Sequence, residues 1–354
     1  GSEMCIRDSF TTMKKHLIWA AASAALLASC AKEETQTFTP AATDLPQASI
    51  TFVAEENADF TRAFFDNTTT TEAWEQSLSS LTVFCFEEGA LVMRRNFTSA
   101  ELSSRRSTFA LPRSTAGKSI EFYALANAAV DENITTKTAL LALTEETPGS
   151  YNGTFANVSS KALRSGGFLM SGTATKSIGA AGTTTEVAIT LRRDVAKVAV
   201  QASLSPAFAD KYPGTVRITS VKLSRSAMQT PYFGGTPKTG AMTFTHTQTP
   251  GETSGRFNAL FYCFENAALA SGSRVLLTLD GVYDRDGKTS TTSDQVPISY
   301  EVELSGTAGN GQLARNGYYR VAIGLTGLTG QDVTASITVA PWEIPVTQNI
   351  NIGI

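Results

Sequence analysis

The sequence predicts an all-β protein with two tandem β-sandwich domains and a few short helices. Apolar and polar residues alternate with a period of two at many places along the chain, and no long helical periodicity accompanies them. Strands and helices do not alternate in the rhythm that indicates a parallel sheet. The length of 354 residues, with 42% apolar and 17% charged residues, suits about two folded domains.

The charges nearly balance. The chain has 29 basic and 32 acidic side chains, a formal net charge of −3. Proteins that bind nucleic acid through its phosphates carry a basic surplus. We therefore expect no nucleic acid partner.

An export signal precedes the folded part. Residues 1–12 are interpreted as an upstream or cloning-derived segment, and residues 13–29 as a lipoprotein signal peptide with a cationic start and an apolar run too short to span a bilayer. Small residues come directly before Cys30, as in the lipobox of bacterial lipoproteins, so Cys30 is the predicted lipid attachment site. The lipid would anchor the precursor in the outer membrane. An ordinary secretory signal with a chance cysteine is the alternative.

The segment after Cys30 is predicted to be a tether. Residues 30–46 are rich in Thr, Glu, Ala and Pro and contain few large apolar side chains, which is typical of a lipidated flexible spacer. The folded protein is predicted to begin near Gln47.

The N-terminal β-sandwich is predicted over residues 47–191. Its strands are expected at Ile50–Phe52, Leu81–Phe86, Ala90–Met93, Ile120–Ala126, Phe168–Ser171 and Val187–Leu191. Glu87-Glu88-Gly89 predicts a hairpin turn between the second and third of these strands. Short helices are expected at Glu72–Ser79, at Ala100–Ser104 behind a capping-box pattern, and at Lys137–Leu143.

A change of parity predicts the boundary between the domains. Val187, Ile189 and Leu191 occupy odd positions, whereas the apolar residues from Ala196 to Val200 occupy even ones. A shift of one residue turns a strand's side chains to the opposite face. We therefore place the start of the second domain at residue 192.

The C-terminal β-sandwich is predicted over residues 192–354. Its strands are expected at Ala196–Ala202, Val216–Leu223, Phe257–Phe264, Arg274–Leu279, Val296–Leu304, Tyr318–Leu325 and Val333–Val339. Asp284–Gly287 predicts a hairpin turn. With Asp280 it is similar to a calcium loop, but Val282 stands at a ligand position and no glutamate closes the loop, so a metal site is not predicted.

The remaining polar and sulfur groups do not predict an enzyme. His246, the sole imidazole after the signal, lies in a predicted Thr-rich loop and is expected at the surface. The pairs Glu87-Glu88 and Glu145-Glu146 are expected to be solvated turn charges. Cys85 and Cys263 lie in aromatic strand patterns and are expected to be buried and unpaired. No catalytic residue, cofactor or metal is therefore predicted.

Four motifs resemble landmarks of one protein family. They are Leu169–Gly172, Thr190–Val198, Ala314–Val321 and Val339–Trp342. In order and spacing they are similar to the Bacteroidales fimbrillins, which build type V pili from lipoprotein precursors. The resemblance implies two transthyretin-like β-sandwich domains, assembly by strand exchange with other fimbrial subunits, and adhesion to a receptor on a host or bacterial surface.

The C-terminus has the pattern of a strand that another subunit could accept. Ile344, Val346, Ile350, Ile352 and Ile354 share one parity, while polar residues and glycine dominate the other. Residues of this kind could add a strand to a neighbour's sheet. The alternative is that they form the last strand of their own domain.

A donor strand needs a vacant acceptor slot. In the family, a protease that cuts after an arginine removes the first strand, and Arg62 lies at a suitable place in this sequence. Arg62 as a solvated loop charge is the alternative.

Three hypotheses for the function follow. The protein is a polymerising fimbrial subunit at the cell surface, a lipid-retaining anchor or tip adhesin of the same family, or a surface lipoprotein that binds glycans.

Overall fold

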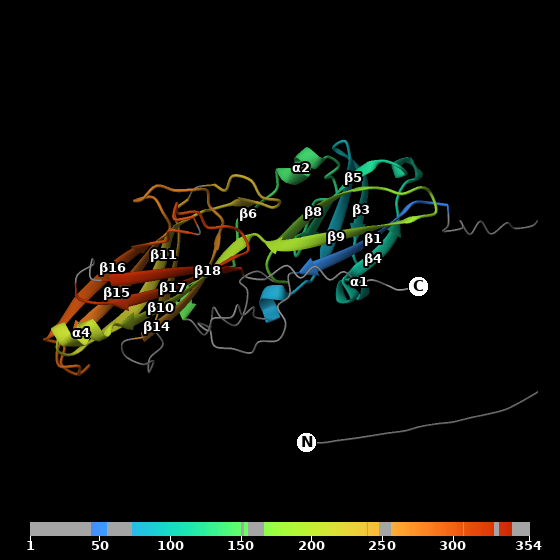
Figure 1. The fold of residues 1–354 in the computed structure, drawn as a ribbon. Helices are drawn as coiled ribbons and strands as arrows, with labels where there is room; N and C mark the ends of the chain where they lie inside the picture. Colours follow the sequence, from blue (N-terminus) through green and yellow to red (C-terminus); the bar gives the residue numbers. More distant parts are fainter. Residues whose placement is uncertain are drawn as a thin grey trace, which may run out of the picture. The chain divides into compact units, whose positions relative to one another are not determined.

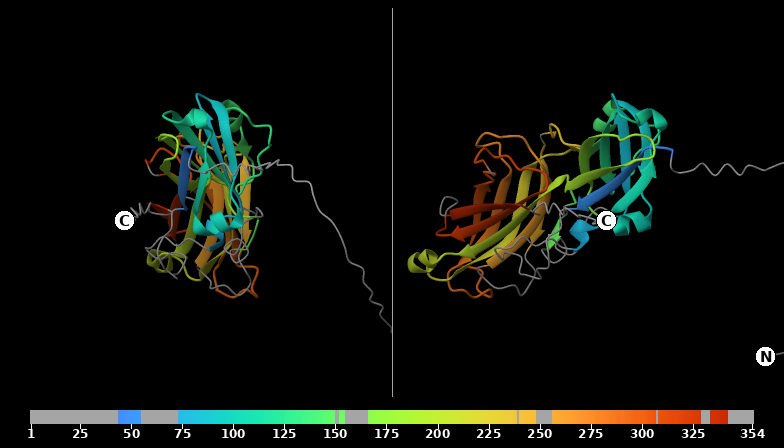
Figure 2. Two further views of the ribbon diagram at one scale, coloured as in Figure 1. Left: turned by 90° about the vertical axis from the view of Figure 1, so that its right-hand side faces the viewer. Right: turned by 45° about the vertical axis from the view of Figure 1, so that its right-hand side comes forward.

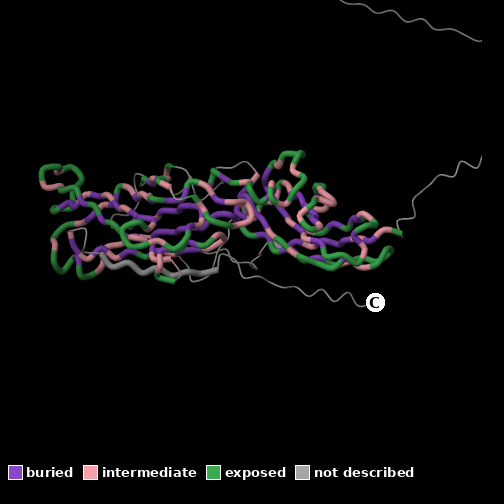
Figure 3. Tube along the Cα trace, turned by 90° about the horizontal axis from the view of Figure 1, so that it is seen from above, coloured by how far each residue is buried: buried purple, intermediate pink, exposed green. Residues whose placement is uncertain are grey.

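Most of the described chain is β-structure with a few short helices between the strands. The computed structural model describes residues 44–54, 73–149, 152–154, 166–238, 240–247, 256–306, 308–328 and 333–341. Two larger sets of strands are seen in Figures 1 and 2, one blue to green and the other yellow to red. The buried residues follow the strands of both sets, and the exposed residues gather in the connections (Figure 3).

The first sheet has seven strands in the order β3-β2-β5-β8-β9-β1-β4. Their bounds are Gln47–Ala54 (β1), Leu81–Glu87 (β2), Ala90–Asn96 (β3), Arg106–Ala110 (β4), Ser119–Ala126 (β5), Met170–Ser177 (β8) and Thr184–Arg193 (β9). β8 and β9 pair only at Met170–Arg193 and Ser171–Arg192, which joins two arms of the sheet. Buried side chains from both arms form one hydrophobic cluster, here called the first core, which includes Ile50, Val83, Phe122 and Ile189.

Two further sheets enclose the second core. A four-stranded sheet has the order β14-β10-β17-β18, and a five-stranded sheet has the order β16-β15-β11-β13-β7. The bounds are Gly153–Thr154 (β7), Val195–Leu204 (β10), Thr215–Ser226 (β11), Met242–Thr247 (β13), Arg256–Phe264 (β14), Leu276–Asp284 (β15), Gln295–Glu303 (β16), Gly317–Leu325 (β17) and Val333–Pro341 (β18). Both sheets contribute to this cluster, for example Val198 and Val321 from one sheet and Val221, Leu279 and Tyr300 from the other.

A two-stranded ribbon pairs β6 (Thr144–Glu145) with β12 (Thr230–Pro231). β6 and β7 come from the first predicted domain, and they pair with β12 and β13 of the second. The division at residue 191/192 is therefore crossed by short strands, and it stays a prediction.

Local sequence explains the short elements. α1 (Ser99–Ser104) has the predicted capping box, in which Thr98 accepts from the Glu101 N–H and Glu101 accepts from the Thr98 N–H. The β2–β3 hairpin turns at Glu88 and Gly89, both with positive φ (48° and 87°), a conformation that suits the twist of a two-residue turn. α2 (Lys137–Leu141) is also present as predicted, and α4 spans Pro206–Lys211.

Several predictions of local structure were wrong. The helix expected over Glu72–Ser79 is, in its described part, only the 3-10 turn η1 (Ala73–Gln76), which is followed by irregular chain. β4, β13, α4 and the 3-10 turn η2 (Arg113–Thr115) were not expected. The predicted hairpin turn at Asp284–Gly287 opens a longer connection, since β16 begins at Gln295. Val296 shares the parity of the buried residues Ile298, Tyr300 and Val302, but it lies near the start of β16 and is 53% exposed.

Candidate assembly site

β1 is a central strand that bonds along both of its edges. It runs parallel to β9 from the pair Gln47–Thr184 to the pair Ala54–Leu191. Along its other edge it runs antiparallel to β4, from Gln47–Ala110 to Thr51–Arg106. Without β1, both β4 and β9 would present unpaired backbone groups, which is the usual template for adding a strand.

The inner face of β1 is part of the first core. Ala48 and Ile50 are 0% exposed and Phe52 is 2% exposed. The Phe52 ring lies edge-on to Phe97, with 5.4 Å between ring centroids. Each fully buried large side chain contributes about 1.5–3 kcal/mol, so these residues hold β1 mainly through apolar burial.

Polar residues cover the outer face of β1. Arg106 of β4 reaches across the strand: its Nε and Nη2 donate to the Ser49 hydroxyl (3.0 and 2.8 Å). Nη2 also lies 3.0 Å from Glu186 Oε1 of β9. The Arg106 and Glu186 side chains are 43% and 62% exposed, so solvent weakens this ion pair.

The described chain resumes after β1 at η1, which is fastened to the four-stranded sheet. Trp74 packs against Phe168 and Tyr262, with ring centroids 5.3 and 5.4 Å away. Glu75 is fully buried; its Oε1 lies 2.8 Å from Lys197 Nζ of β10 and accepts a hydrogen bond from the Tyr262 hydroxyl. Trp74 therefore has a packing role, and Glu75 forms a buried ion pair beside it.

The four fimbrillin-like motifs lie next to one another in space. The first two pair where β8 meets β9. The third is tied to the second because the Asn316 N–H donates to the Val195 carbonyl (2.8 Å) and Arg193 Nη1 donates to Asn316 Oδ1 (2.9 Å). The described residues of the fourth motif lie in β18 and pair with Gly317–Tyr319 of the third.

This meeting point explains two of the motif residues. Arg193 is only 1% exposed, and its Nε donates to the Glu75 backbone carbonyl at 2.8 Å, so a buried guanidinium links η1 to the end of β9. Gly172 admits no side chain, because a Cβ there would lie 2.2 Å from the Thr190 carbonyl oxygen. The motifs therefore join β8, β9, β10, β17 and β18.

All seven predicted site residues lie outside the described residues. These are the lipid attachment site Cys30, the protease site Arg62, and the donor-strand residues Ile344, Val346, Ile350, Ile352 and Ile354. Described structure ends at Pro341 in β18, whose neighbour in the sheet order is β17. The residues that would accept a donor strand, on β4 and β9, were not singled out in the sequence, although the Ser107/Phe109 alternation of β4 was a signal for a strand.

Cys85 and Cys263 are buried and free, as predicted, and burial raises the pKa of each thiol to about 12. Both thiols are therefore inert hydrophobic groups at neutral pH.

His246 was expected at the surface, and this prediction is wrong. The residue is fully buried on β13, and its ring centroid lies 4.4 Å from that of Phe261. Burial lowers its pKa to about 4. Glu145 was also expected to be solvated and is only 7% exposed. It accepts hydrogen bonds from the Glu146 and Thr147 N–H groups. Both errors arose where a short strand replaced a predicted loop.

None of the helices in the described ranges has the length and apolarity needed to cross a membrane.

Known proteins resemble this chain over most of its length. Residues 44–347 match the family described as fimbrillin-A associated anchor proteins Mfa1 and Mfa2. Curated proteins give no match.

Solved structures with the same fold include fimbrilin (FimA) from Porphyromonas gingivalis W83, with 15% identity, 86% of this chain and 99% of that chain covered, and a TM-score of 0.57. The tip fimbrial protein Mfa3 from the same species, in a form with a C-terminal truncation, has 14% identity, coverage of 84% and 99%, and a TM-score of 0.52. A fimbrial assembly protein from Parabacteroides distasonis has 12% identity, coverage of 83% and 98%, and a TM-score of 0.50. Because the family match spans most of the sequence, this chain belongs to the Mfa1/Mfa2 family of fimbrial proteins, which are structural components of the cell surface and not enzymes.

Proposed function

We propose that this protein is a subunit of a type V-like fimbria that polymerises when a protease removes β1 and the C-terminal strand of another subunit takes its place. The observation that carries the proposal is the position of β1, with a strand bonded along each edge and an apolar inner face. A vacated slot of this kind would expose two strand edges and part of the first core.

The C-terminal residues have the pattern that the slot requires. β1 buries Ala48, Ile50 and Phe52 at alternate positions. The predicted donor strand offers Ile350, Ile352 and Ile354 at the same spacing. Its backbone would restore the hydrogen bonds to β4 and β9, and its isoleucines would fill the space that β1 leaves in the core.

The attachment of η1 supports removal of β1 alone. Arg62 lies between Ala54, the end of β1, and Ala73, the start of η1. A cut there would separate β1 from the rest of the chain, while Trp74 and Glu75 keep the new N-terminal segment bound to the four-stranded sheet.

Export and domain organisation complete the proposal. Cys30 would carry the lipid that brings the precursor to the outer membrane, and residues 30–46 would be its tether. Residues 47–191 and 192–354 would be two transthyretin-like β-sandwich domains. Head-to-tail donation of one strand per copy would then give an open filament that presents the protein to a surface receptor.

A lipid-retaining anchor is the second candidate. The description of the matched family names anchor proteins, and an anchor would keep its acylated Cys30 instead of losing it with β1. A tip adhesin would accept a strand without donating one.

Arginine-specific proteolysis of the purified full chain tests the first proposal. Cleavage should give a new N-terminus at Ala63, release β1, and produce ladders that survive SDS without heating. The R62A variant should stay uncut at that position and monomeric. A variant that lacks residues 344–354 should be cut after Arg62 and still fail to polymerise.

Two results would contradict the proposal. One is wild-type protein that remains monomeric after verified cleavage at Arg62. The other is a ladder of equal length from the variant without residues 344–354. Mass spectrometry of the N-terminus from surface material separates the candidates, because a subunit would begin at Ala63 and an anchor at an acylated Cys30.

A further inference from the structure

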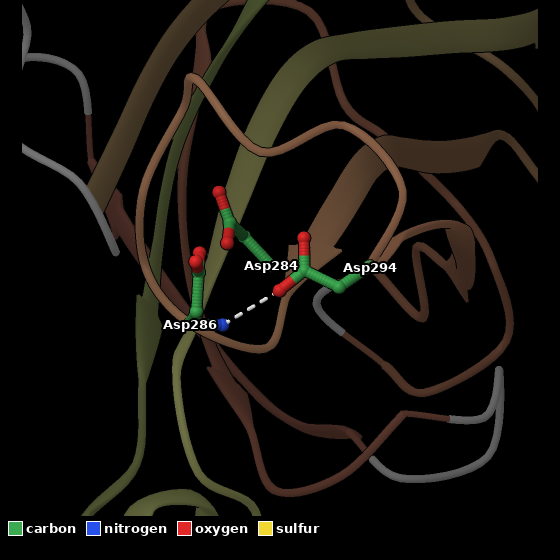
Figure 4. Close-up of side chains that lie close together, drawn as sticks. All are labelled: Asp284, Asp286 and Asp294. Carbon is green, nitrogen blue, oxygen red and sulfur yellow. Dashed lines mark hydrogen bonds between the residues drawn. The ribbon is translucent and has the colours of Figure 1, made fainter.

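The connection between β15 and β16 gathers three carboxylates. Asp284 ends β15, Asp286 follows two residues later, and Asp294 comes directly before β16. One oxygen atom from each lies within 4.8 Å of the other two. The carboxylates of Asp284 and Asp286 point towards each other, and that of Asp294 lies beside them (Figure 4).

The carboxylate of Asp284 has a buried oxygen atom that needs a partner, which is stronger evidence for a bound ion than a cluster of acidic residues alone. Asp284 is 0% exposed, and its Oδ1 is buried with no hydrogen-bond partner among the described residues. Its Oδ2 accepts from Gln295 Nε2 at 3.2 Å and lies 4.0 Å from Arg217 Nη2. A buried carboxylate oxygen without a partner carries a large desolvation cost unless a cation or a donor satisfies it.

Asp294 repeats this feature, because its Oδ1 is also a buried atom without a partner in the described part of the chain. Its Oδ2 accepts from the Asp286 N–H at 3.0 Å, which fixes the loop around the carboxylates. Two unsatisfied carboxylate oxygens therefore occur in one small cluster.

The local charge favours a divalent ion. Within the described ranges, Arg217 is the one cationic side chain within 4.0 Å of these three carboxylates, which leaves a surplus of about two negative charges. The Lys288 N–H donates to Asp286 Oδ1 at 2.8 Å, which holds this carboxylate in place at the start of the connection.

We propose that Asp284, Asp286 and Asp294 bind a calcium ion that ties the two ends of the β15–β16 connection together. Only oxygen ligands are offered, as hard cations prefer, and two of the three come from an irregular loop that can adapt to the longer and more variable bonds of calcium. Water and loop carbonyls would complete the coordination. The site is independent of strand exchange, so its failure would leave the proposed assembly untouched.

The sequence pattern did not predict this site, because a calcium loop is expected to close with a glutamate, whereas here Asp294 closes the connection. Asp280, which belongs to the calcium-like pattern in the sequence, lies apart from the cluster and pairs with Lys222 at 2.7 Å. A D-x-D pattern at the end of one strand, with a third aspartate just before the next, was the available signal.

Calorimetric titration of the metal-stripped full chain with CaCl₂ tests the proposal, together with thermal unfolding in buffers of matched ionic strength. Wild type should bind with a Kd of about 0.1–1 mM, the range of extracellular calcium modules, and its Tm should rise by a few degrees at saturation. D286N should bind at least about tenfold more weakly; it folds because the Asp286 side chain is exposed. D280N, the same substitution outside the cluster, should bind like wild type.

Three outcomes would overturn the proposal. Wild type without heat or Tm shift up to about 10 mM calcium would exclude a site of the expected affinity. Equal binding by D286N would place the ion elsewhere. An equal Tm shift with magnesium would contradict the assignment of calcium, because magnesium demands a smaller and more regular octahedral shell.

Discussion

β1 and β10 occupy equivalent places in two parts of the molecule, but they are held differently. Each is a central strand with one parallel and one antiparallel neighbour: β9 and β4 for β1, β17 and β14 for β10. Each also presents alternate apolar residues to a core. The inner faces are thus alike.

The outer faces differ. β1 presents Ser49 beneath the half-exposed Arg106. β10 presents Val195 and Ala199 to an apolar cluster outside the second core, which also contains Phe168 and Tyr262. On the same face, Lys197 pairs with buried Glu75. β10 is therefore locked on both faces, whereas β1 is buried on one face and covered by solvated charges on the other. Removing β1 should therefore cost less free energy than removing β10. Four predictions test this contrast.

The largest effect is expected where the buried ion pair on β10 is broken. Lys197→Ala leaves Glu75 charged and buried without its ammonium partner, and we expect the free energy of unfolding to fall by about 3–5 kcal/mol. Urea titration of the purified protein measures the change.

The exposed pair Lys222–Asp280 supplies the matched control, because its side chains are 45% and 33% exposed. Lys222→Ala should cost no more than about 1 kcal/mol. If Lys197→Ala costs as little as Lys222→Ala, the lock on the outer face of β10 does not exist.

A somewhat smaller effect is expected on the inner face of β1. Ile50→Ala removes a fully buried side chain from the first core and should destabilise the intact protein by about 2–5 kcal/mol. After cleavage at Arg62 the difference from wild type should vanish, because β1 is no longer part of the folded chain. Urea titrations before and after cleavage give both values.

Thr51→Ala, on the half-buried outer face, is the control and should change stability little in either state. A cost of Ile50→Ala that persists after verified cleavage would show that β1 stays in its slot, and the contrast with β10 would then fail.

The next prediction uses pH to separate the two cores. His246 is buried behind β14, and its pKa falls from an ordinary 6.5 to about 4. Since the unfolded chain binds this proton first, stability should fall as pH drops from about 6.5 to 4, by up to about 3 kcal/mol. Glu101, near the first core, has a pKa lowered to about 2: burial acts against the shift, but hydrogen bonds from Ser107, Thr98 and Arg95 outweigh it, so its contribution is lost only below about pH 4.5.

His246→Leu should therefore reduce the loss of stability between pH 7 and 4.5, as measured by urea titration at both values. Glu101→Gln should lower the stability by a similar amount at both values, and so leave the loss across that interval unchanged. An undiminished loss in the His246 variant would assign the acid sensitivity to other groups.

Much of the strand pattern could be predicted because burial on one face forces alternation. Tyr318–Leu325 lies within β17, where every second side chain from Tyr319 onwards is in the second core. Val216–Leu223 lies within β11, where the alternation holds on each side of a register shift after Ile218. β4 and β13 were missed because Ser, Thr and Arg dilute their apolar residues, and such strands are specified by the partners that they pair with.

The candidate sites depended even more on tertiary structure. Arg193 lies between the predicted strands Val187–Leu191 and Ala196–Ala202, yet its guanidinium is buried and donates to the Glu75 carbonyl of η1, far away along the chain. Asp294 joins Asp284 only because β15 and β16 pair from Asp284–Gln295 onwards. Contacts between distant segments cannot be predicted from the local sequence pattern. The four family motifs did indicate such contacts, because they lie next to one another in the structure.

The smallest effect is expected at the charged cover of β1, and it decides whether the two outer faces truly differ. Glu186→Gln removes the carboxylate that Arg106 reaches, but both side chains are substantially exposed, so the loss should stay below about 1 kcal/mol. Urea titration beside Lys197→Ala compares the two outer faces under identical conditions. A loss above about 2 kcal/mol would mean that β1 is fastened outside as firmly as β10, and that its release would need more than a cut in the chain.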